Sequence, residues 1–304
     1  MTSLAIIILT HNEEIHIGRA LAAVAPLDPH VVIVDAGSTD RTLDIAAAHG
    51  ATILKNPWTN YARQFQWALD HADIRADWVM RLDADEIVEP DLVEELRQNL
   101  PTLPPAISGV NLRRKHVFMG RWIRHGGRYP LVLLRIWRRG HARIEQRWMD
   151  EHMLLTRGAA VTFGGGFADV NLNDLGFFTD KHNRYATREA VDVINARRNL
   201  FARDKALTAA NTSGAANLTR ILKEGLYNRL PPGLGAGGYF FLRYVVQLGF
   251  LDGREGAIYH VLQGFWYRYL VGAKVLELER AIEGLDDESA LGELARLTGL
   301  SFDT

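Results

Sequence analysis

Blocks of apolar and polar residues alternate along the first hundred positions of the chain. Leu4–Thr10 is a continuous apolar run rich in β-branched residues, which is typical of a strand covered on both faces. Further short apolar runs predict strands at Val31–Val34, Ala51–Leu54 and Trp78–Leu82. The segments between the runs have helical spacing and predict helices over residues 13–24, about 38–49, 61–71 and 91–100. Strands that alternate with helices predict an α/β fold with a doubly wound, mostly parallel sheet.

The chain becomes less regular after Pro101–Pro105, which we interpret as a boundary. Two more strands are predicted at Ile107–Leu112 and Leu131–Trp137, separated by a loop over Arg113–Tyr129 that is rich in arginine, histidine and glycine. We interpret the glycine triplet at 164–166 as a turn or loop.

Beyond Asp180 the pattern turns helical, and two aromatic-rich helical segments follow at Tyr239–Leu251 and Ile258–Leu278. The acidic tail from Glu283 predicts a short or frayed helix. We therefore predict a catalytic domain over residues 1–180, with a nucleotide half at 1–105 and an acceptor half at 106–180. Residues 181–304 are predicted to form a helical C-terminal region.

Composition and charge exclude several classes of function. The 304 residues are 47% hydrophobic, enough for a sizeable core, and the net charge of −1 provides no global field for nucleic acid. The absence of cysteine excludes disulfides, thiolate nucleophiles and cysteine-based zinc sites. The apolar run at Leu4–Leu9 is too short for a secretory signal, and no window approaches the roughly 20 apolar residues of a spanning helix. We expect a cytoplasmic protein, soluble or peripheral.

Polar side chains follow three of the predicted strands at the point where each strand ends. Asn12 and Asp35 follow the first two strands, and Asp83 and Asp85 follow the fourth. Carboxyl ends of parallel strands share one edge of a sheet, so these residues are expected to meet there in a nucleotide site. Paired carboxylates are hard oxygen ligands suited to Mg²⁺ or Mn²⁺, although an isolated Asp-X-Asp is more often a solvated turn. The buried strand that is predicted before Asp83 favours metal binding over a solvated turn.

Three motifs give the chain a resemblance to a known family. Ile8–Glu14, Val34–Asp40 and Leu82–Glu86 resemble the corresponding motifs of the family-2 glycosyltransferases with the GT-A fold. More specifically, the chain looks like the bacterial subgroup of lipopolysaccharide-core β-glucosyltransferases. The motifs that carry this narrower resemblance are Gly120–Gly127, Leu134-Arg135, Asp150–His152, Lys181–Tyr185 and Leu248–Gly253.

The resemblance implies inverting transfer of a sugar from a nucleotide-sugar donor to a hydroxyl of a glycan or glycolipid acceptor, assisted by a divalent metal. Asp85 is the implied metal ligand, and Asp83 is expected to contact the metal or the ribose. Glu151 is the implied general base, with Asp150 as the alternative, and His152 is expected to orient rather than abstract the proton. The residues expected to contact the nucleotide sugar are Thr10, Asn12, Glu14, Asp35, Arg63, Asp83, Ala84, Arg128 and Arg135. Many family members carry two adjacent acids where this chain has Asp35-Ala36, so Asp35 alone is expected to contact the base or ribose.

Two other functions compete with this interpretation. A sugar nucleotidyltransferase also combines a doubly wound sheet with metal-binding carboxylates, but it usually carries a glycine-rich, lysine-bearing loop after the first strand. Here the loop Thr10–Glu14 is acidic and free of glycine. The other rival is a non-catalytic scaffold protein that keeps the fold without the chemistry, which the retained Asp85 and Glu151 disfavour. Gly233–Gly238 matches the dinucleotide fingerprint but follows two prolines instead of a strand, so we reject it.

The aromatic-rich segments have two interpretations of equal weight. Their aromatic residues are interleaved with Arg243 and Arg268, a combination that suits the membrane interface, and each segment is too short to span a bilayer. The alternative is a helical hairpin that packs on the catalytic domain or on a second subunit of a homo-oligomer. A lipopolysaccharide-core or other lipid-linked acceptor needs interfacial access. We therefore expect peripheral attachment to the cytoplasmic face of the inner membrane.

Overall fold

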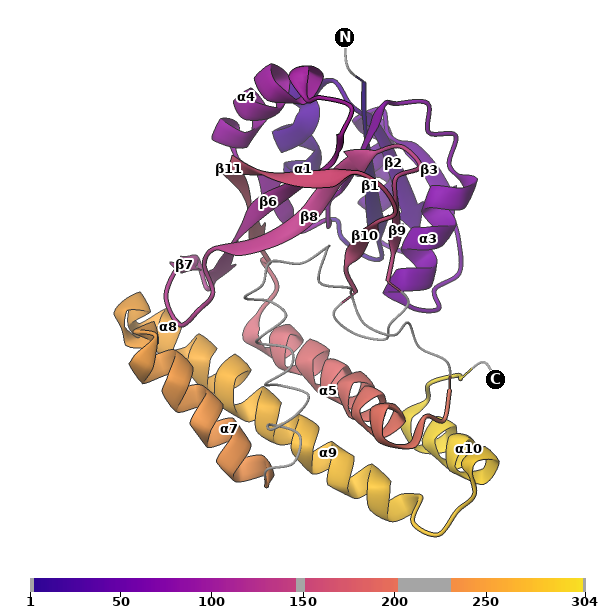
Figure 1. The fold of residues 1–304 in the computed structure, drawn as a ribbon, viewed down its shortest axis with the longest axis vertical. Helices are drawn as coiled ribbons and strands as arrows, with labels where there is room; N and C mark the ends of the chain where they lie inside the picture. The colour runs from indigo at the N-terminus through magenta and orange to yellow at the C-terminus, as the bar shows by residue number, and fades with distance from the viewer. Residues whose placement is uncertain (1–2, 146–150, 202–230, 303–304) are drawn as a thin grey trace. The chain divides into compact units, whose positions relative to one another are not determined.

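The computed structural model describes residues 3–145, 151–201 and 231–302. Two compact units are present, and each is described by itself. The first contains the described residues up to Glu145 together with Glu151–Leu172, and the second begins at Asn173 (Figure 1).

The first unit is built on a nine-stranded sheet with the order β3-β2-β1-β4-β8-β6-β11-β5, and β7 pairs with β6. The strands are β1 (Leu4–Thr10), β2 (His30–Asp35), β3 (Thr52–Lys55), β4 (Trp78–Arg81), β5 (Glu86–Val88), β6 (Ile107–Phe118), β7 (Arg121–Ile123), β8 (Leu131–Arg138) and β11 (Ala159–Val170). The first four strands and the β6–β11 pair are parallel, whereas β5, β7 and β8 run in the opposite direction. A separate antiparallel pair joins β9 (Ala142–Ile144) to β10 (Met153–Leu155).

Helices cover both faces of this sheet. They are α1 (Ile17–Val24), α2 (Thr42–Ala48), α3 (Tyr61–His71) and α4 (Pro90–Asn99). Successive side chains of a strand point to opposite faces, so the apolar run of β1 supplies both cores. Ile6 and Ile8 pack in the core that also contains residues of α1 and α4, while Ile7 packs with Phe65 of α3 (Figure 1). The predicted α/β fold, a mixed, mostly parallel sheet with flanking helices followed by a helical C-terminal region, is confirmed.

Two local predictions for this unit are wrong. The predicted loop over Arg113–Tyr129 is partly strand, because β6 continues to Phe118 and pairs with β7. The glycine triplet at 164–166 lies inside β11 instead of a turn. A Cβ on Gly165 would lie 2.6 Å from the Cα of Leu92, and one on Gly166 would lie 2.5 Å from the carbonyl oxygen of Arg113. These glycines are there because the backbones of α4 and β6 approach β11 closely.

The second unit is helical in its described part. Its helices are α5 (Leu175–Arg198), α7 (Pro232–Phe241), α8 (Gly253–Tyr259), α9 (Tyr267–Ala281) and α10 (Asp287–Thr298). α5 and α7 lie along α9 (Figure 1), and α10 adds Ala290 and Leu294 to an apolar core with α5 and α9. α5 begins before the predicted boundary at residue 180 because the side chain of Asp174 caps it by accepting from the N–H of Phe177. The helical pattern predicted over residues 202–223 lies outside the described residues.

The aromatic-rich segments are helical but interrupted. α7 passes into a π-helical turn at Leu242–Val246, and a second π-helical turn at His260–Trp266 separates α8 from α9. Among the described residues no single helix is long and apolar enough to cross a membrane. The pair Gly233–Val246 and Gly249–Ala281, bent by 70°, meets the requirement of length and composition jointly.

Candidate active site

Several side chains that the sequence predicts to be functional lie at one edge of the sheet in the first unit. The carboxyl ends of β1, β2, β4, β6 and β11 lie at this edge, because these strands run in one direction. The antiparallel strand β5 starts at the same edge. The short turn Asp83–Asp85 is therefore anchored by β4 before it and by β5, which pairs with β11, after it. The edge therefore presents backbone turns and polar side chains from segments up to 160 residues apart, such as Thr10 and Val170.

Asp83 is enclosed by one tyrosine and two arginines. The hydroxyl of Tyr61, in the first turn of α3, donates to Oδ1 of Asp83. Nε of Arg81 lies 3.8 Å from the same oxygen, and Nη2 of Arg135 lies 3.7 Å from Oδ2. Burial alone would raise the pKa of Asp83, but Arg81 and then Arg135 outweigh that effect and lower it. Asp83 is therefore a fixed negative charge whose oxygens are already engaged.

A buried arginine–glutamate pair lies beneath Asp83. Nη2 of Arg135 donates to Oε1 of Glu86 over 2.7 Å, and the side chains are 4% and 1% exposed. Oε2 of Glu86 accepts from the backbone N–H of Asp83 over 2.9 Å, which fixes the turn. Burial raises the pKa of Glu86 to about 8, because removal from water disfavours its charged form more than Arg135 favours it. Arg135, predicted from the sequence to contact the donor, is thus engaged by the chain's own acids.

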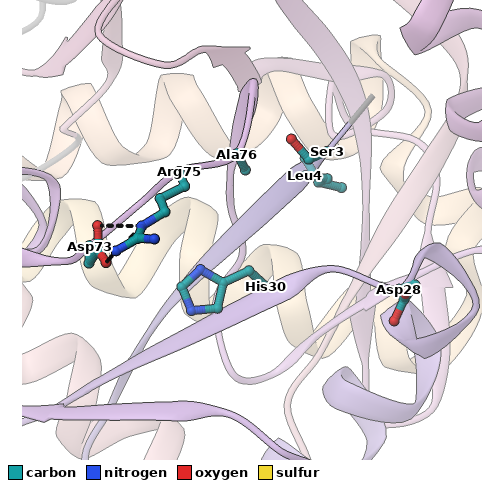
Figure 2. A pocket seen from close by; sticks show the side chains of 7 residues that line it. All are labelled: Ser3, Leu4, Asp28, His30, Asp73, Arg75 and Ala76. Atoms are coloured by element: carbon teal, nitrogen blue, oxygen red, sulfur yellow. Dashed lines mark hydrogen bonds and ion pairs between the residues drawn. The ribbon is translucent and has the colours of Figure 1, made fainter. Parts of the chain in front are cut away.

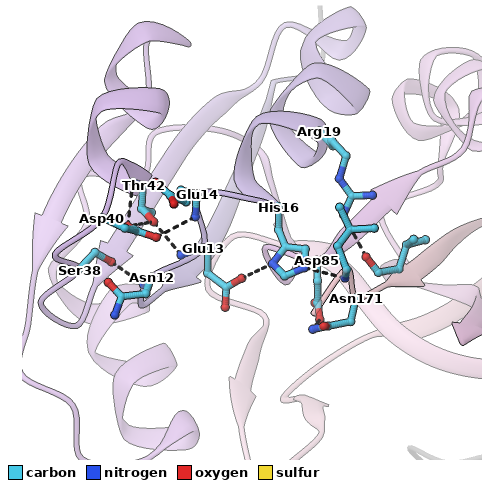
Figure 3. Close-up of polar contacts among 12 residues, drawn as sticks. Asn12, Glu13, Glu14, His16, Arg19, Ser38, Asp40, Thr42, Asp85 and Asn171 are labelled. Atoms are coloured by element: carbon cyan, nitrogen blue, oxygen red, sulfur yellow. Dashed lines mark hydrogen bonds and ion pairs between the residues drawn. The ribbon is translucent and has the colours of Figure 1, made fainter. Parts of the chain in front are cut away.

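Asp85 has a different neighbourhood from Asp83. Its Oδ2 accepts from Nδ2 of Asn171 over 2.9 Å, and its backbone oxygen accepts from the N–H of Val170 over 2.9 Å (Figure 3). Both partners come from the end of β11, which the sequence did not associate with Asp85. A neutral amide therefore helps to orient the half-buried Asp85, and two cations and a tyrosine help to orient Asp83.

The loop after β1 is tied to the loop after β2 by backbone-to-side-chain hydrogen bonds. Asn12, in the left-handed region with φ 57°, accepts from the N–H of Thr39 over 2.8 Å. Glu14 accepts from the N–H of Arg41 over 3.1 Å. It donates its own N–H to Asp40 over 3.1 Å (Figure 3). Asn12 and Glu14 therefore hold the two loops together, and their predicted contact with the nucleotide sugar stays a prediction.

The carboxylate of Asp35 closes the loop after β2. It accepts from the hydroxyls of Thr10 and Ser38 over 3.0 and 2.5 Å and from the N–H groups of Gly37 and Ser38 over 2.8 Å each. Gly37 has φ 98°, which the tight turn requires and which L side chains rarely adopt. Burial would raise the pKa of Asp35, but these hydrogen bonds outweigh it and lower the pKa. Asp35 is 1% exposed, and its predicted contact with the base or ribose stays a prediction.

Two residues of the α1 region anchor the end of β11 that carries Asn171. Nε2 of His16 accepts from the N–H of Leu172 over 2.9 Å, so in neutral His16 the proton is on Nδ1, which donates to Glu13 over 2.6 Å. Nη2 of Arg19 donates to the carbonyl of Val170 over 3.0 Å (Figure 3). His16 is 1% exposed, so this connection is part of the interior.

Glu151, the predicted general base, lies beside Arg81. Nη1 of Arg81 donates to the backbone oxygen of Glu151 over 3.3 Å, and the same guanidinium reaches Asp83. The neighbouring His152 accepts through its backbone oxygen from the N–H of Glu145 over 2.9 Å, and its Nδ1 lies 3.5 Å from the Glu145 carboxylate. Residues 83 and 151 are thus brought together by one arginine. The alternative base, Asp150, lies outside the described residues.

Other predicted donor contacts are more dispersed. Ala84 is buried at the centre of the turn, whereas Arg63 is exposed in the first turn of α3, where its N–H binds the capping side chain of Asn60. Arg128 is half-buried near His116, whose Nδ1 is 3.0 Å from Oδ2 of Asp169. Burial first, and then Arg128 among the nearby cations, lower the pKa of His116 against the opposing effect of Asp169.

Sequence reasoning missed three residues of this edge: Tyr61, Arg81 and Asn171. Arg81 is 11% exposed, and its guanidinium stacks 4.2 Å from the centre of the Tyr61 ring. The available signal was an arginine within an otherwise apolar strand, because a charge is rarely buried without partners. Tyr61 and Asn171 left no signal, because their contacts with the aspartates depend on how distant segments pack.

The oxygen donors at this edge fit a divalent ion that is shared with a substrate. Among residues 3–145, 151–201 and 231–302, no group of three or more His, Asp or Glu side chains is arranged to hold an ion alone. Mg²⁺ usually binds to one or two carboxylates and completes its shell with water and phosphates. Asp85 fits this pattern as a single, half-buried carboxylate in the turn between β4 and β5. Asp83 is engaged by cations, and its role as a ligand stays a prediction.

A hollow of about 450 Å³ lies elsewhere on the first unit (Figure 2). It is lined by Ser3 and Leu4 at the start of β1, by His30 at the start of β2 and by the exposed Asp73–Arg75 ion pair. These are the amino ends of the strands, so this hollow lies at the edge opposite the carboxylates.

Known proteins resemble parts of this chain. Residues 5–164 match the family described as Glycosyl transferase family 2. An "Uncharacterized glycosyltransferase RT0209" of Rickettsia typhi is 36% identical over 96 residues, 32% of each chain. One from Rickettsia bellii is 36% identical over 89 residues, 29% of this chain and 30% of that relative. The matches thus span about a third of the length of these relatives. Among solved structures, glucosyl-3-phosphoglycerate synthase from Mycobacterium tuberculosis in complex with Mn²⁺, UDP and glucosyl-3-phosphoglycerate is 24% identical, with a TM-score of 0.31, over 38% of this chain and 44% of that one.

Proposed function

The chain belongs to glycosyl transferase family 2, and from that premise we propose that it transfers a sugar, with inversion, from a nucleotide-sugar donor to a hydroxyl of a surface-glycan acceptor. The single observation that carries the proposal is the position of Arg81. Its guanidinium contacts the backbone of Glu151 and lies 3.8 Å from Asp83, two residues before Asp85. This proximity of residues 83 and 151 supports a reaction that uses one acid for the donor and another for the acceptor.

The leaving nucleoside diphosphate gains negative charge as the glycosidic bond breaks. A Mg²⁺ or Mn²⁺ ion held by Asp85 and by the diphosphate would supply Lewis-acid stabilisation of that charge. Asn171 orients the carboxylate of Asp85 through the 2.9 Å hydrogen bond, and the connections from His16 and Arg19 fix the end of β11 that carries it. The carboxylate of Asp85, which would bind the metal, is thereby held in position before the donor binds.

The acceptor hydroxyl must lose a proton as it attacks the anomeric carbon. In this proposal the carboxylate of the half-buried Glu151 takes that proton. Arg81 and Glu145 hold the backbone of this segment through hydrogen bonds to the carbonyl oxygens of Glu151 and His152. Inversion is a single displacement, so one base is sufficient and no covalent intermediate forms.

The roles of Asp85 and Glu151 separate in binding and transfer measurements. A thermal-shift screen of nucleotide sugars with and without Mn²⁺ should identify a stabilising donor class for the intact chain, and Asp85→Ala should lose that stabilisation. Glu151→Gln should bind the same donor normally yet transfer at least about a hundredfold more slowly, because general-base catalysis contributes about 10²–10⁴-fold. Glu293→Gln, an acid on α10 paired with Arg296, serves as the control and should keep both properties. Normal transfer by Glu151→Gln would eliminate it as the base.

The products decide between the proposal and its two rivals. An inverting transferase releases a nucleoside diphosphate and yields a product of the opposite anomeric configuration, which NMR of the product measures. A nucleotidyltransferase releases pyrophosphate from a nucleoside triphosphate. A scaffold protein binds a donor without consuming it.

We take the acceptor to be a lipopolysaccharide-core or other lipid-linked glycan at the cytoplasmic face of the inner membrane, as the narrower resemblance of the Gly120–Gly127 and Leu248–Gly253 motifs suggests. Transfer by the purified chain to core oligosaccharides, compared with transfer to free monosaccharides, tests this choice. Equal transfer to both would remove the support for a glycolipid acceptor.

A further inference from the structure

An apolar surface lies on the second unit, at the turn that joins α7 to α8. Seven of the eleven residues at 241–251 are large apolar residues with exposed side chains, among them Phe241 at 57%, Val246 at 58% and Leu251 at 50%. The turn contains one charged residue, Arg243, and that side chain is only 5% exposed. We call residues 241–251 the apolar turn.

The apolar surface continues along both arms of the bent helix pair. Of the 21 exposed large hydrophobic side chains in the described part of the chain, 12 lie within residues 234–276, including Leu234 at 69% and Tyr269 at 48%. Soluble monomers rarely expose a contiguous apolar area of this kind unless it binds something. A surface of this kind is expected to bind a partner, and the residues that form it indicate the chemistry of that partner.

The glycines of α7 point to a lipid environment. α7 contains Gly233, Gly235, Gly237 and Gly238, and a Cβ on Gly237 or Gly238 would meet no atom within 4 Å. Packing therefore does not require glycine at these two positions, and in water glycine weakens a helix interior. In a membrane the backbone has no competing water, and glycine is more frequent in helices there.

We propose that the apolar turn inserts into the interfacial layer of a lipid bilayer, with the two helix arms lying along the surface. The arms are bent by 70°, and only the two together have the length and composition of a membrane segment. The π-helical turn at Leu242–Val246 and the 3₁₀ turn at Gly249–Asp252 break the regular hydrogen bonding of the backbone. Irregular backbone exposed to lipid is not tolerated in the hydrocarbon core, so the turn enters to a depth of about 5–10 Å instead of crossing.

The attraction to the bilayer is apolar instead of electrostatic. The two arginines expected from the sequence at the membrane surface are directed into the unit: Arg268 bonds Glu189 over 2.7 Å, and Arg243 bonds the hydroxyl of Tyr239 over 3.0 Å. Binding should consequently be the same on neutral phosphatidylcholine vesicles and on vesicles with anionic lipid, and it should persist in high salt. This feature distinguishes the turn from a basic amphipathic helix.

Flotation of the full chain with phosphatidylcholine vesicles tests the proposal. The wild type should float with the vesicles, and Val245→Ser/Val246→Ser/Leu251→Ser should partition more weakly by about tenfold for each side chain. Leu285→Ser/Leu297→Ser, which changes two exposed apolar residues outside the surface, is the matched control and should float like the wild type. Circular dichroism of each variant checks that the helices remain. A wild type that stays in the soluble fraction overturns the proposal.

A site-specific reporter gives a second measurement that does not depend on the triple variant. The chain has no cysteine, so Leu248→Cys and Leu297→Cys can each be labelled uniquely with an environment-sensitive fluorophore. Vesicles should shift the emission of the label at 248 to shorter wavelength and leave the label at 297 unchanged. If the surface instead binds a second copy of the chain, light scattering will show a dimer that the triple variant dissociates, with no flotation, and the proposal is refuted. Neither measurement uses a sugar donor, so this proposal and the proposed function can fail separately.

Discussion

The buried Arg135–Glu86 pair beneath Asp83 allows a prediction whose size follows from the structure. Arg135 is 3% exposed, bonds Glu86 over 2.7 Å and lies 3.7 Å from Asp83. In Arg135→Met, two acids lose their shared cation while Glu86 stays out of water. Where Glu86 is ionised, above pH 8, removing its cationic partner strands a buried charge and costs about 3–5 kcal/mol of unfolding free energy.

The loss should depend on pH in a defined direction. Burial raises the pKa of Glu86 from 4.5 to about 8 in the folded protein, so between these values the folded state holds a proton that the unfolded state has released. This contribution to stability is present at low pH and is lost as pH rises through 8. In Arg135→Met the pKa rises further, because Arg135 is the group that lowers it. The deficit relative to the wild type should therefore be larger at pH 9 than at pH 6, where Glu86 is protonated in both proteins.

Urea unfolding at the two pH values measures the effect. Glu86→Gln in the Arg135→Met background removes the stranded charge and keeps an acceptor for the N–H of Asp83, so it should recover at least half of the loss at pH 9. Arg296→Met, at an exposed ion pair, is the control and should leave stability unchanged. A deficit below about 1 kcal/mol for Arg135→Met at pH 9, or no recovery in the double variant at that pH, would refute the reasoning. Donor affinity in the double variant separately tests the predicted contact of Arg135 with the donor.

Two further predictions concern the end of β11. Asn171→Ala removes the hydrogen bond that orients Asp85 and should weaken Mn²⁺ binding in the presence of donor by about 10–100-fold, measured by electron paramagnetic resonance; unchanged affinity would show that Asn171 does not position the ligand. Gly165→Ala places a Cβ 2.6 Å from the Cα of Leu92 and should cost about 1–3 kcal/mol of unfolding free energy, whereas Gly237→Ala, with no atom within 4 Å, should stabilise α7; equal effects in thermal unfolding would contradict the close approach at β11.

The local pattern of the sequence determined the strands and helices that bring Thr10, Asp35, Asp83 and Asp85 to one edge. Apolar runs and helical spacing are local patterns of a few residues. β1 and α3 therefore match their predicted bounds, β2 and β3 differ by one residue at each end, and β4 differs by one residue at its carboxyl end. The direction of these parallel strands then follows from their helical connections. The sequence alone was therefore sufficient to predict that these four residues lie at the same edge of the sheet.

The tertiary structure decided which partners these acids have. Asp83 is held by Tyr61, Arg81 and Arg135, and Glu86 is paired with an arginine 49 positions away. Asp85 meets Asn171 because β11 pairs with β5, a strand of three residues that is too short to leave a pattern. Likewise, the glycine triplet at 164–166 predicted a turn, and only the packing of α4 against β11 explains why glycine is needed within that strand. Such contacts join segments that are far apart in the chain, so their energies depend on packing, which no local window of the sequence contains.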